Sequence, residues 1–308
     1  MGFFFEVLIG GLLSGVLYAL VALGFVLIYK ASGVFNFAQG AMVFFAALTF
    51  VGFTEVLPGW TGLEGGGQAV FWLAFVLALA SMVVLGILTE KVVLRPLVNQ
   101  PPITLFMATI GLTFLIEGIA QGIWGANVRG LELGIDDEPI GWLMDSVNIL
   151  VSKFDVFAAL AAGILVVTLA LLFQYTRVGR ALRAVADDHQ AALSIGIPLQ
   201  HIWAIVWAVA GFVALVAGLI WGSRNGVQFA LTFTALKALP VLILGGFTSV
   251  PGAIVGGLII GAGEKIAEVF WGDAFGGAIE DWFAYMLALV FLMFRPQGLF
   301  GERIIERV

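Results

Sequence analysis

The sequence predicts an all-α polytopic membrane protein, on the evidence of its composition, its long apolar runs and its lack of alternating segments. Of its 308 residues, 61% are hydrophobic and only 11% are charged, whereas soluble domains average about 25% charged residues. Several apolar runs reach the roughly 17–25 residues that cross a bilayer. These runs must be helical, because lipid offers no partner to unpaired backbone groups. The short alternating segments of a membrane β-barrel are absent from the sequence.

The predicted spans are separated by polar or turn-rich breaks. The runs cover residues 7–29, 41–57, 69–88, 103–123, 154–173, 202–222, 233–247, 253–270 and 282–294. The run at 233–247 is short for a full span and ends in Gly245-Gly246. It and the run after it therefore form either two crossings or one re-entrant hairpin of broken helices. We predict about eight to nine membrane helices, in a single membrane domain covering residues 1–308.

The positive charges indicate how the chain is oriented, because short cytoplasmic loops are enriched in Lys and Arg. Most of these residues fall after alternate spans: Lys30, Lys91, Arg95, Arg177, Arg180, Arg183 and Arg295. The loops in between are acidic, with few exceptions such as Arg129, Lys153 and Arg224. We therefore expect a plasma (inner) membrane protein with its N-terminus outside and its C-terminus in the cytoplasm.

Several classes of function are disfavoured by what the sequence lacks. The net charge is −6 and there is no basic patch with interleaved aromatic residues, which argues against nucleic acid as a partner. With no cysteine, and with His189 and His201 isolated, no metal site is expected. No phosphate loop of the form G-x-x-x-x-G-K-[ST] is found. No cofactor is expected, and any ATP chemistry must reside on another polypeptide.

The segment 174–198 interrupts the apolar pattern with three arginines and two aspartates. Four apolar residues have the spacing of one side of a short helix: Val178, Leu182, Val185 and Leu193. Arg183 and Asp187 are four residues apart and can pair. Gly196 and Pro198 are stop signals for that helix. The segment is either a solvated loop that satisfies the charge rule or a surface that receives a partner.

Two polar features could line a translocation pathway. Asn36, Phe37, Gln39 and Gly40 lie at a junction between spans, where a broken helix can expose backbone groups to a cavity. The alternative is an ordinary interfacial turn. Glu117 lies deep in the fourth run and belongs to a polar stripe that recurs every four residues: Thr109, Thr113, Glu117 and Gln121. A carboxylate at this depth is usually turned inward, for pathway lining or for a structural hydrogen bond.

The late apolar runs contain further charges and many glycines. Lys237 is expected to pair with a carboxylate in the bundle, for which Glu117 is one hypothetical partner. Glu264 and Lys265 face the bundle or reach the outer interface by snorkelling, which is favoured for Lys265. The glycine pairs Gly252/Gly256 and Gly257/Gly261 have small-xxx-small spacing, which predicts close helix packing. Gly245 and Gly246 would lie near the pathway if this region is re-entrant.

Four stretches carry a specific resemblance, in the same order along the chain. They are SGVLYALVALGFVLIYKASGVFNFAQGAM, GRALRAVADDHQAALSIGIP, LGGFTSVPGAIVGGLIIGAGEKI and RPQGLFGER. The chain resembles the LivH-type permeases (LivH/UrtB-like family), the membrane subunits of branched-chain amino acid ABC importers. That family commonly has His where this chain has Gln39, so a titratable group is missing from the junction.

The resemblance implies a transmembrane permease subunit rather than an enzyme. Its expected partners are a second, related or identical permease subunit, two cytoplasmic ATPase subunits, an extracytoplasmic solute-binding protein, and membrane lipid. In the family the cytoplasmic loop docks on the ATPase, and by that resemblance the coupling residues are Arg180, Arg183, Ala184, Asp187, Ala191, Ala192 and Gly196. The implied solute is a branched-chain amino acid, another amino acid, urea or a short amide.

Two other functions are compatible with the sequence. A stand-alone secondary transporter or channel would need no ATPase, and would show an inverted repeat or several membrane-buried ionisable groups in corresponding halves. A structural membrane subunit is the third alternative. Co-purification with a P-loop ATPase distinguishes the importer from both.

Overall fold

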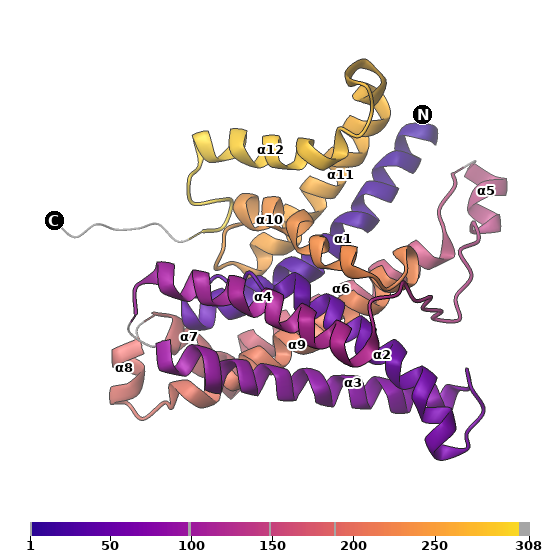
Figure 1. The fold of residues 1–308 in the computed structure, drawn as a ribbon. Helices are drawn as coiled ribbons and strands as arrows, with labels where there is room; N and C mark the ends of the chain where they lie inside the picture. The colour runs from indigo at the N-terminus through magenta and orange to yellow at the C-terminus, as the bar shows by residue number, and fades with distance from the viewer. Residues whose placement is uncertain (1, 98–99, 148, 188, 302–308) are drawn as a thin grey trace. The chain divides into compact units, whose positions relative to one another are not determined.

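The computed structural model describes residues 2–97, 100–147, 149–187 and 189–301, and within them the regular secondary structure consists of helices and two isolated β-bridges (Figure 1). The predicted all-α class is confirmed. The long helices are α1 (Gly2–Ser32), α2 (Gln39–Thr61), α3 (Gln68–Leu88), α4 (Pro102–Trp124), α6 (Lys153–Tyr175), α9 (Leu199–Asn225) and α11 (Val250–Phe275). The shorter elements are η1 (Thr89–Leu94), η2 (Arg95–Leu97), α5 (Gly141–Val147), α7 (Arg177–Asp187), α8 (His189–Ser194), η3 (Phe229–Phe233), α10 (Thr234–Gly245) and α12 (Glu280–Phe294).

The number of membrane spans is smaller than the predicted eight to nine, which was approximate. Among the described residues, six helices are long and apolar enough to cross a membrane, and α3 does so together with η1 and η2 as one 30-residue span. The segments Phe229–Gly245 and Val250–Phe275 add a seventh span if they count as one, with a bend of 113° between them. This is the broken-helix arrangement that the short run at 233–247 indicated.

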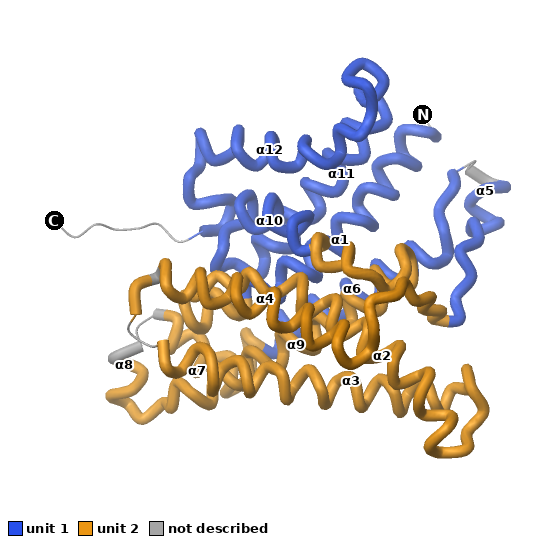
Figure 2. The backbone as a smooth tube through the Cα atoms, viewed as in Figure 1, with its two compact units in different colours: residues 1–26, 134–172, 235–308 blue, residues 27–133, 173–234 orange. Residues whose placement is uncertain are grey.

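The chain divides into two compact units, shown in blue and orange in Figure 2. Unit 1 contains residues 1–26, 134–172 and 235–308, and unit 2 contains residues 27–133 and 173–234. Boundaries fall inside α1 and α6 and after the first residue of α10, so these helices contribute residues to both units. The single domain over residues 1–308 stays a prediction.

Unit 2 is built on α2, α3 and α9, which pack against one another, with α4 against α2. Glycines bring these helices close together. A Cβ on Gly86 of α3 would lie 2.9 Å from the backbone carbon of Trp207 in α9, and one on Gly218 of α9 would lie 2.5 Å from the Val43 carbonyl oxygen in α2. Such backbone approach replaces the hydrophobic driving force that lipid cannot supply between helices.

The two ends of unit 2 carry different features. Helix α8 leads through Pro198 into the start of α9, so α7 and α8 lie at one end of that helix. Asn225, at the other end, is followed by Val227, whose backbone pairs with Arg129 in the loop after α4. The turn between α2 and α3 lies at this second end (Figures 1 and 2). We call the two ends the α7–α8 end and the α2–α3 end.

Unit 1 is held by close contacts between α1 and α11 and by the bend between α10 and α11. A Cβ on Gly15 of α1 would lie 2.4 Å from the Gly257 carbonyl oxygen of α11. The segment after α12 returns to the end of α10, where Leu299 N–H donates to Leu244 O over 2.8 Å. Helix α12 packs on α11.

The acidic loop before α6 is also part of unit 1. Lys153 Nζ donates to Glu138 Oε2 over 2.9 Å. This hydrogen bond, reinforced by the charge of the ammonium group, lowers the pKa of the Glu138 carboxyl below its ordinary value. Lys153 is one of the positive charges that did not fit the predicted orientation, and here it neutralises an acidic loop.

Candidate functional site

The junction between α1 and α2 is a buried polar turn in unit 2. Asn36 and Gln39 are both 0% exposed. Asn36 Nδ2 donates to Gln39 Oε1 over 3.3 Å, and Phe37 N–H donates to Thr109 Oγ1 of α4 over 3.2 Å. Complete burial and a contact with α4 distinguish this turn from the ordinary interfacial turn that was the alternative. It is a break between helices packed inside protein, the setting in which membrane proteins tolerate irregular backbone.

The polar stripe on α4 is buried along most of its length. Thr109, Thr113 and Glu117 are 0%, 7% and 6% exposed. The predicted inward orientation is therefore seen for all three residues. The Thr113 hydroxyl donates to Thr109 O of the preceding turn over 3.0 Å, a local bond within α4.

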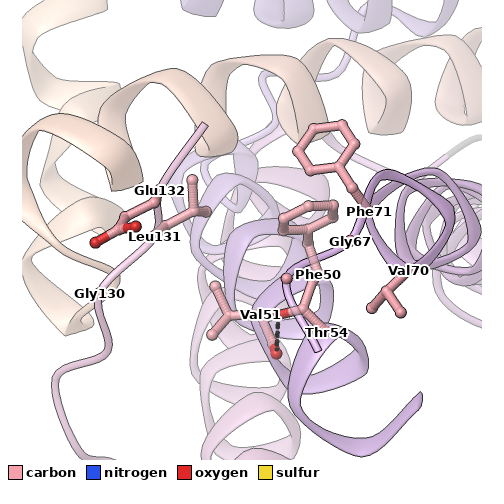
Figure 3. A pocket seen from close by; sticks show the side chains of 10 residues that line it. Phe50, Val51, Thr54, Gly67, Val70, Phe71, Gly130, Leu131 and Glu132 are labelled. Atoms are coloured by element: carbon pink, nitrogen blue, oxygen red, sulfur yellow. Dashed lines mark hydrogen bonds between the residues drawn. The ribbon is translucent and has the colours of Figure 1, made fainter. Parts of the chain in front are cut away.

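A pocket opens at the α2–α3 end of unit 2 (Figure 3). Its volume is about 210 Å³. It is lined by Phe50, Val51, Thr54, Gly66, Gly67, Val70, Phe71, Gly130, Leu131 and Glu132. The rings of Phe50 and Phe71 meet edge to face with centroids 5.2 Å apart, whereas the Glu132 carboxylate is turned away from them (Figure 3). The walls are thus mainly aromatic, aliphatic and glycine backbone.

Arg129 closes the loop beside this pocket. Its guanidinium pairs with Glu55 of α2 and donates to the Trp124 carbonyl at the end of α4. A cation at this position satisfies one of the carbonyl groups that every helix leaves unpaired at its C-terminus. The ion pair explains a positive charge on the otherwise acidic side of the predicted topology.

Lys237 lies in a cluster of charges in unit 1. Its Nζ is 2.7 Å from Asp281 Oδ1 and 3.4 Å from Glu264 Oε1, and Tyr18 OH donates to the same Glu264 oxygen over 2.9 Å. The expected pairing with a carboxylate is therefore present. The partners are Glu264 and Asp281, whereas the hypothetical partner Glu117 belongs to unit 2.

The neighbouring residues Glu264 and Lys265 have different surroundings. The Glu264 side chain is 1% exposed and faces Lys237, so it is turned into unit 1. Lys265 Nζ is 2.7 Å from Glu280 Oε2 of α12, and the Lys265 side chain is 38% exposed. The preferred snorkelling of Lys265 stays a prediction.

We expect Lys237→Met to destabilise the protein by removing the cation that neutralises Glu264. Leaving one partner of a buried ion pair unpaired costs about 3–5 kcal/mol, and the value should fall at the lower end because Lys237 is 28% exposed. The measurement is the thermal unfolding of the purified chain. The double variant Lys237→Met/Glu264→Gln should recover most of the loss, and failure of this recovery would show that Lys237 acts through something other than charge.

Gly245 and Gly246 form the turn at the bend between α10 and α11. A Cβ on Gly245 would lie 2.2 Å from Gly252 O, and Gly246 has a φ of +103°, which side chains rarely adopt. Both glycines are therefore required by packing and by backbone conformation. Their place in a translocation pathway stays a prediction.

Two arginines of α7 bind the end of α6. Arg183 Nη1 donates to Phe173 O over 2.6 Å and its Nη2 to Gln174 O over 3.1 Å, while Arg180 Nη1 donates to Tyr175 O over 3.3 Å. Three carbonyl groups that α6 leaves unpaired are thus satisfied from α7. Asp187 ends α7, and its side chain, and with it the predicted pair with Arg183, lies outside what the structure describes.

The apolar side predicted for this segment is correct only for α7. Leu182 and Val185 are 2% and 0% exposed, but Leu193 of α8 is 54% exposed. In α8 the buried residue is Ala192, at 1%, while Ala191 faces outward. The prediction for Leu193 was wrong because α7 and α8 are separate helices, so the helical phase of α7 does not continue into α8. Ala184 is half-buried on α7.

Gly196 ends α8 in a left-handed conformation. Its φ is +84°, its N–H donates to Leu193 O over 3.0 Å, and Ile197 N–H donates to Ala192 O over 3.0 Å. These two bonds form a Schellman motif, which favours glycine at this position. The predicted stop signal is confirmed, and it leaves the Ile195 side chain 73% exposed.

Three parts of these sites were missed by sequence reasoning. Thr109 was recognised only as a member of the α4 stripe, yet it is the residue that contacts the turn. Tyr18 and Asp281 join the Lys237 cluster from helices distant in sequence, and no local pattern indicates this. Leu193 and Ile195 form an exposed apolar surface on and after α8 that the periodicity did not suggest.

Comparisons with known proteins agree on one family. The profile described as "Branched-chain amino acid transport system / permease component" matches residues 7–294. The permease protein BraD of a high-affinity branched-chain amino acid transport system from Pseudomonas aeruginosa is 27% identical over 308 residues, covering 99% of this chain and 98% of that protein. The corresponding protein LivH from Escherichia coli is 25% identical over 317 residues, covering 99% and 98%. A fructose import permease protein from Bifidobacterium longum is 26% identical over 235 residues, covering 73% and 63%.

Proposed function

The chain belongs to the branched-chain amino acid transport permease family, and from that premise we propose that it is the transmembrane permease subunit of an ATP-binding-cassette importer. The protein is a transporter component and not an enzyme. Beyond the family match, one structural observation supports the proposal. The arginines of α7 bind the end of α6, so a membrane helix is connected directly to an amphipathic helix that lies outside the apolar runs.

The proposed contact with the ATPase is a surface at the α7–α8 end, which we call the docking face and define as Arg180, Ala191, Leu193 and Ile195. All four are exposed. Leu193 and Ile195 are large apolar side chains at 54% and 73% exposure, and apolar residues beside an arginine are typical of protein interfaces. Two cytoplasmic ATPase subunits, one on this chain and one on a second related or identical permease subunit, complete the proposed core assembly.

The proposed transmission of force runs through Arg183. Its guanidinium donates to two carbonyl groups at the end of α6, so a movement of α7 is passed to a helix that crosses the membrane. Ala184, Ala192 and Gly196 are the remaining proposed coupling residues; Ala192 is 1% exposed, and Gly196 ends α8 with its φ of +84°. Asp187 retains its proposed coupling role from the family resemblance alone.

The proposed pathway follows α2 in unit 2. The buried turn of Asn36, Phe37, Gln39 and Gly40 lies at the start of α2, and the pocket with Phe50 and Thr54 lies near its end. At about 1.5 Å per residue, these features are separated by roughly 20 Å of helix. Thr113 and Glu117 of the neighbouring α4 belong to the same proposed pathway. Lys237, Gly245 and Gly246 of unit 1 keep their proposed role in translocation from the sequence reasoning alone.

The proposed orientation places the docking face in the cytoplasm and the α2–α3 end outside. The N-terminus is then outside and the C-terminus is inside. The pocket would face an extracytoplasmic solute-binding protein, which delivers the solute. Membrane localisation follows from the apolar helices and the family.

The proposed solute is a branched-chain amino acid, as the names of most of the similar permeases indicate. A fructose import permease is also similar to this chain, so the proposal is not narrowed to one solute: other amino acids, urea and short amides stay within the proposed range. Solute choice should reside mainly in the solute-binding protein.

We expect Leu193→Glu to abolish capture of the ATPase subunits while leaving the chain folded. The side chain is exposed, so folding is not perturbed, whereas burying an unpaired carboxylate in an apolar contact with the ATPase is costly. The measurement is co-purification of the ATPase with the tagged full-length chain, together with ATP-driven leucine uptake in proteoliposomes. Val128→Glu, at an exposed apolar position near the α2–α3 end, should keep full ATPase capture. Leucine uptake that persists with an inactive ATPase would overturn the importer proposal.

A stand-alone secondary transporter is the second candidate, favoured by one observation. The Lys237, Glu264 and Asp281 cluster places ionisable groups within the apolar helices of unit 1, as secondary transporters do along ion pathways. Uptake driven by a proton or sodium gradient without ATP would favour this candidate.

A further inference from the structure

The start of α2 contains buried hydrogen-bond donors that have no acceptor. Gln39 is the first residue of α2, and its Nε2 is buried and makes no hydrogen bond. The N–H groups of Gly40 and Ala41, which are also buried, donate to no acceptor in the parts of the chain that the structure describes. Every helix has unpaired N–H groups at its start, but these are usually satisfied by a capping side chain or by water. Here the N-cap residue is Ala38, which has no side chain that could cap.

Three consecutive backbone donors before Gly40 are satisfied. Phe37 N–H donates to Thr109 Oγ1 over 3.2 Å, Ala38 N–H to Asn36 Oδ1 over 3.2 Å, and Gln39 N–H to Asn36 O over 3.2 Å. The turn from Phe37 to Gln39 is therefore held by a partner at each backbone N–H. Gln39 Nε2 and the N–H groups of Gly40 and Ala41 follow at the first turn of α2, and burial without a partner is costly for each of them.

The direction of the Gln39 amide follows from this network. Ala38 N–H can be accepted only by an oxygen, so it fixes Oδ1 of Asn36 on its side and turns Nδ2 toward Gln39. Nδ2 is a donor, so the Gln39 atom that faces it over 3.3 Å must be Oε1. Gln39 Nε2 consequently points away from Asn36, and the amide cannot be reversed without placing two donors against each other.

Three donors and no acceptor describe a site for an anionic group. The start of a helix carries a partial positive charge, and its free N–H groups bind carboxylates and phosphates. In transporters built from broken helices, the N-termini of half-helices point at anionic groups of the substrate. The rings of Phe35, Phe37 and Phe106 lie together around the turn, with Phe37 and Phe106 edge to face at 5.9 Å. These aromatic rings suit a compact planar anion better than a phosphate with its hydration shell.

We propose that Gln39 Nε2 and the N–H groups of Gly40 and Ala41 bind the carboxylate of an α-amino acid during transport. This inference rests on the proposed function, in that it assigns a chemical group of the solute to one point of the pathway. Asn36 and Gln39 are 0% exposed, so the site is closed in the present conformation and is reached in another state of the transport cycle. Asn36 and Thr109 act as positioning residues that hold the turn.

The test uses the purified full-length chain in detergent, without ATPase subunits, and three probes that differ in their charged groups. Leucine carries a carboxylate and an ammonium group, isovalerate carries only the carboxylate, and leucinamide lacks it. We expect leucine and isovalerate to raise the Tm by several degrees at about a hundredfold excess over Kd. Leucinamide should leave the Tm unchanged. Equal stabilisation by leucinamide and leucine, or none by any probe at millimolar concentration, would overturn the inference.

The decisive variant is Gln39→Glu. It keeps Oε1 as the acceptor for Asn36 and places an internal carboxylate among the unpaired donors, so it should fold and be more heat-stable than the natural protein. Its Tm should no longer respond to isovalerate, and the KM for leucine uptake should rise by about ten- to a hundredfold, as expected when one hydrogen bond to a charged group is lost. Gln39→Met, which removes the donor without adding charge, should raise KM in the same direction.

Ser81→Ala is the matched control, because Ser81 lies on α3 outside the proposed pathway and its hydroxyl donates to Leu77 O of its own helix over 2.9 Å. It should leave the response of the Tm to isovalerate unchanged. If Gln39→Met is more stable and its response to isovalerate is unaltered, the donors are satisfied by buried water and the inference fails. The Tm measurements need no ATPase, so absence of ATP-driven uptake would count against the proposed function and not against this site.

Discussion

Replacing Gly15 by leucine should abolish accumulation of the folded protein in the membrane. A Cβ at Gly15 would lie 2.4 Å from Gly257 O, and a Cβ at Gly257 would lie 2.5 Å from Gly15 O. The contact is between two backbones, so no side chain can rotate to relieve it. Inserting extra methylene groups into a well-packed region costs about 1–3 kcal/mol even when the neighbours can shift, which is a large part of a typical stability of about 5–15 kcal/mol.

The same contact is repeated one turn away, which makes the expected loss larger. A Cβ at Gly261 would lie 2.4 Å from Gly11 O. Leucine at Gly15 must therefore separate α1 from α11 over both glycine pairs. The measurement is the yield of monodisperse protein after detergent extraction, and the Tm of any that is recovered. Gly10→Leu is the control on the same helix, because a Cβ there meets nothing within 4 Å. A Gly15→Leu protein with the natural yield and Tm would show that this helix contact does not support the fold.

The existence of the helices could be predicted from the sequence because lipid permits few alternatives. Apolar runs identified α1, α2, α3, α4, α6 and α9, but their ends were placed too early or too late. The run 7–29 became Gly2–Ser32, and the run 202–222 became Leu199–Asn225. Helices continue past the apolar core until a residue such as Gly226, with its φ of +74°, ends them. An apolar run therefore indicates which residues lie in the bilayer, whereas the backbone conformation determines where the helix ends.

The candidate sites were predictable only where chemistry is local in sequence. The polar turn at Asn36 and Gln39 and the α4 stripe are local patterns, and both are buried. The partners of Lys237 are not local, because Glu264 and Asp281 come from α11 and α12, and nothing in the sequence sets their distance. Leu193 was grouped with Val178, Leu182 and Val185 on one apolar side because a single helical period was extended across two helices.

The two arginines of α7 illustrate a further limit. Charge counting assigned Arg183 to the cytoplasmic side and suggested Asp187 as its partner, an interpretation based on residues four apart. Its described partners are instead the carbonyl groups of Phe173 and Gln174. Every residue has a backbone carbonyl group, so a side chain that binds carbonyl groups has no partner residue that could be recognised in the sequence. For this reason the link between α6 and α7 emerges only from the structure.

Replacing Arg183 by glutamine should reduce ATP-driven uptake by at least tenfold while the assembled complex continues to hydrolyse ATP. Hydrogen bonds from a charged donor contribute about 1.5–3 kcal/mol each, and the variant loses the guanidinium that donates to two carbonyl groups at the end of α6. Movement of α7 would then no longer be passed to the membrane helix. The measurements are leucine uptake and ATPase activity in the same proteoliposomes, reported as solute carried per ATP.

Two further variants separate coupling from charge. Arg183→Lys keeps the charge but offers a single point of contact in place of a planar fork, so it should recover uptake only in part. Arg177→Gln removes an arginine that is exposed on the first turn of α7 and donates to none of the described residues, and uptake should be unchanged. Binding of the solute-binding protein should be equal in all three variants, because its proposed docking surface is at the α2–α3 end. If the Arg183→Gln complex carries as much solute per ATP as the natural one, the coupling role is wrong. The α7 arginines would then serve only to orient the chain in the membrane.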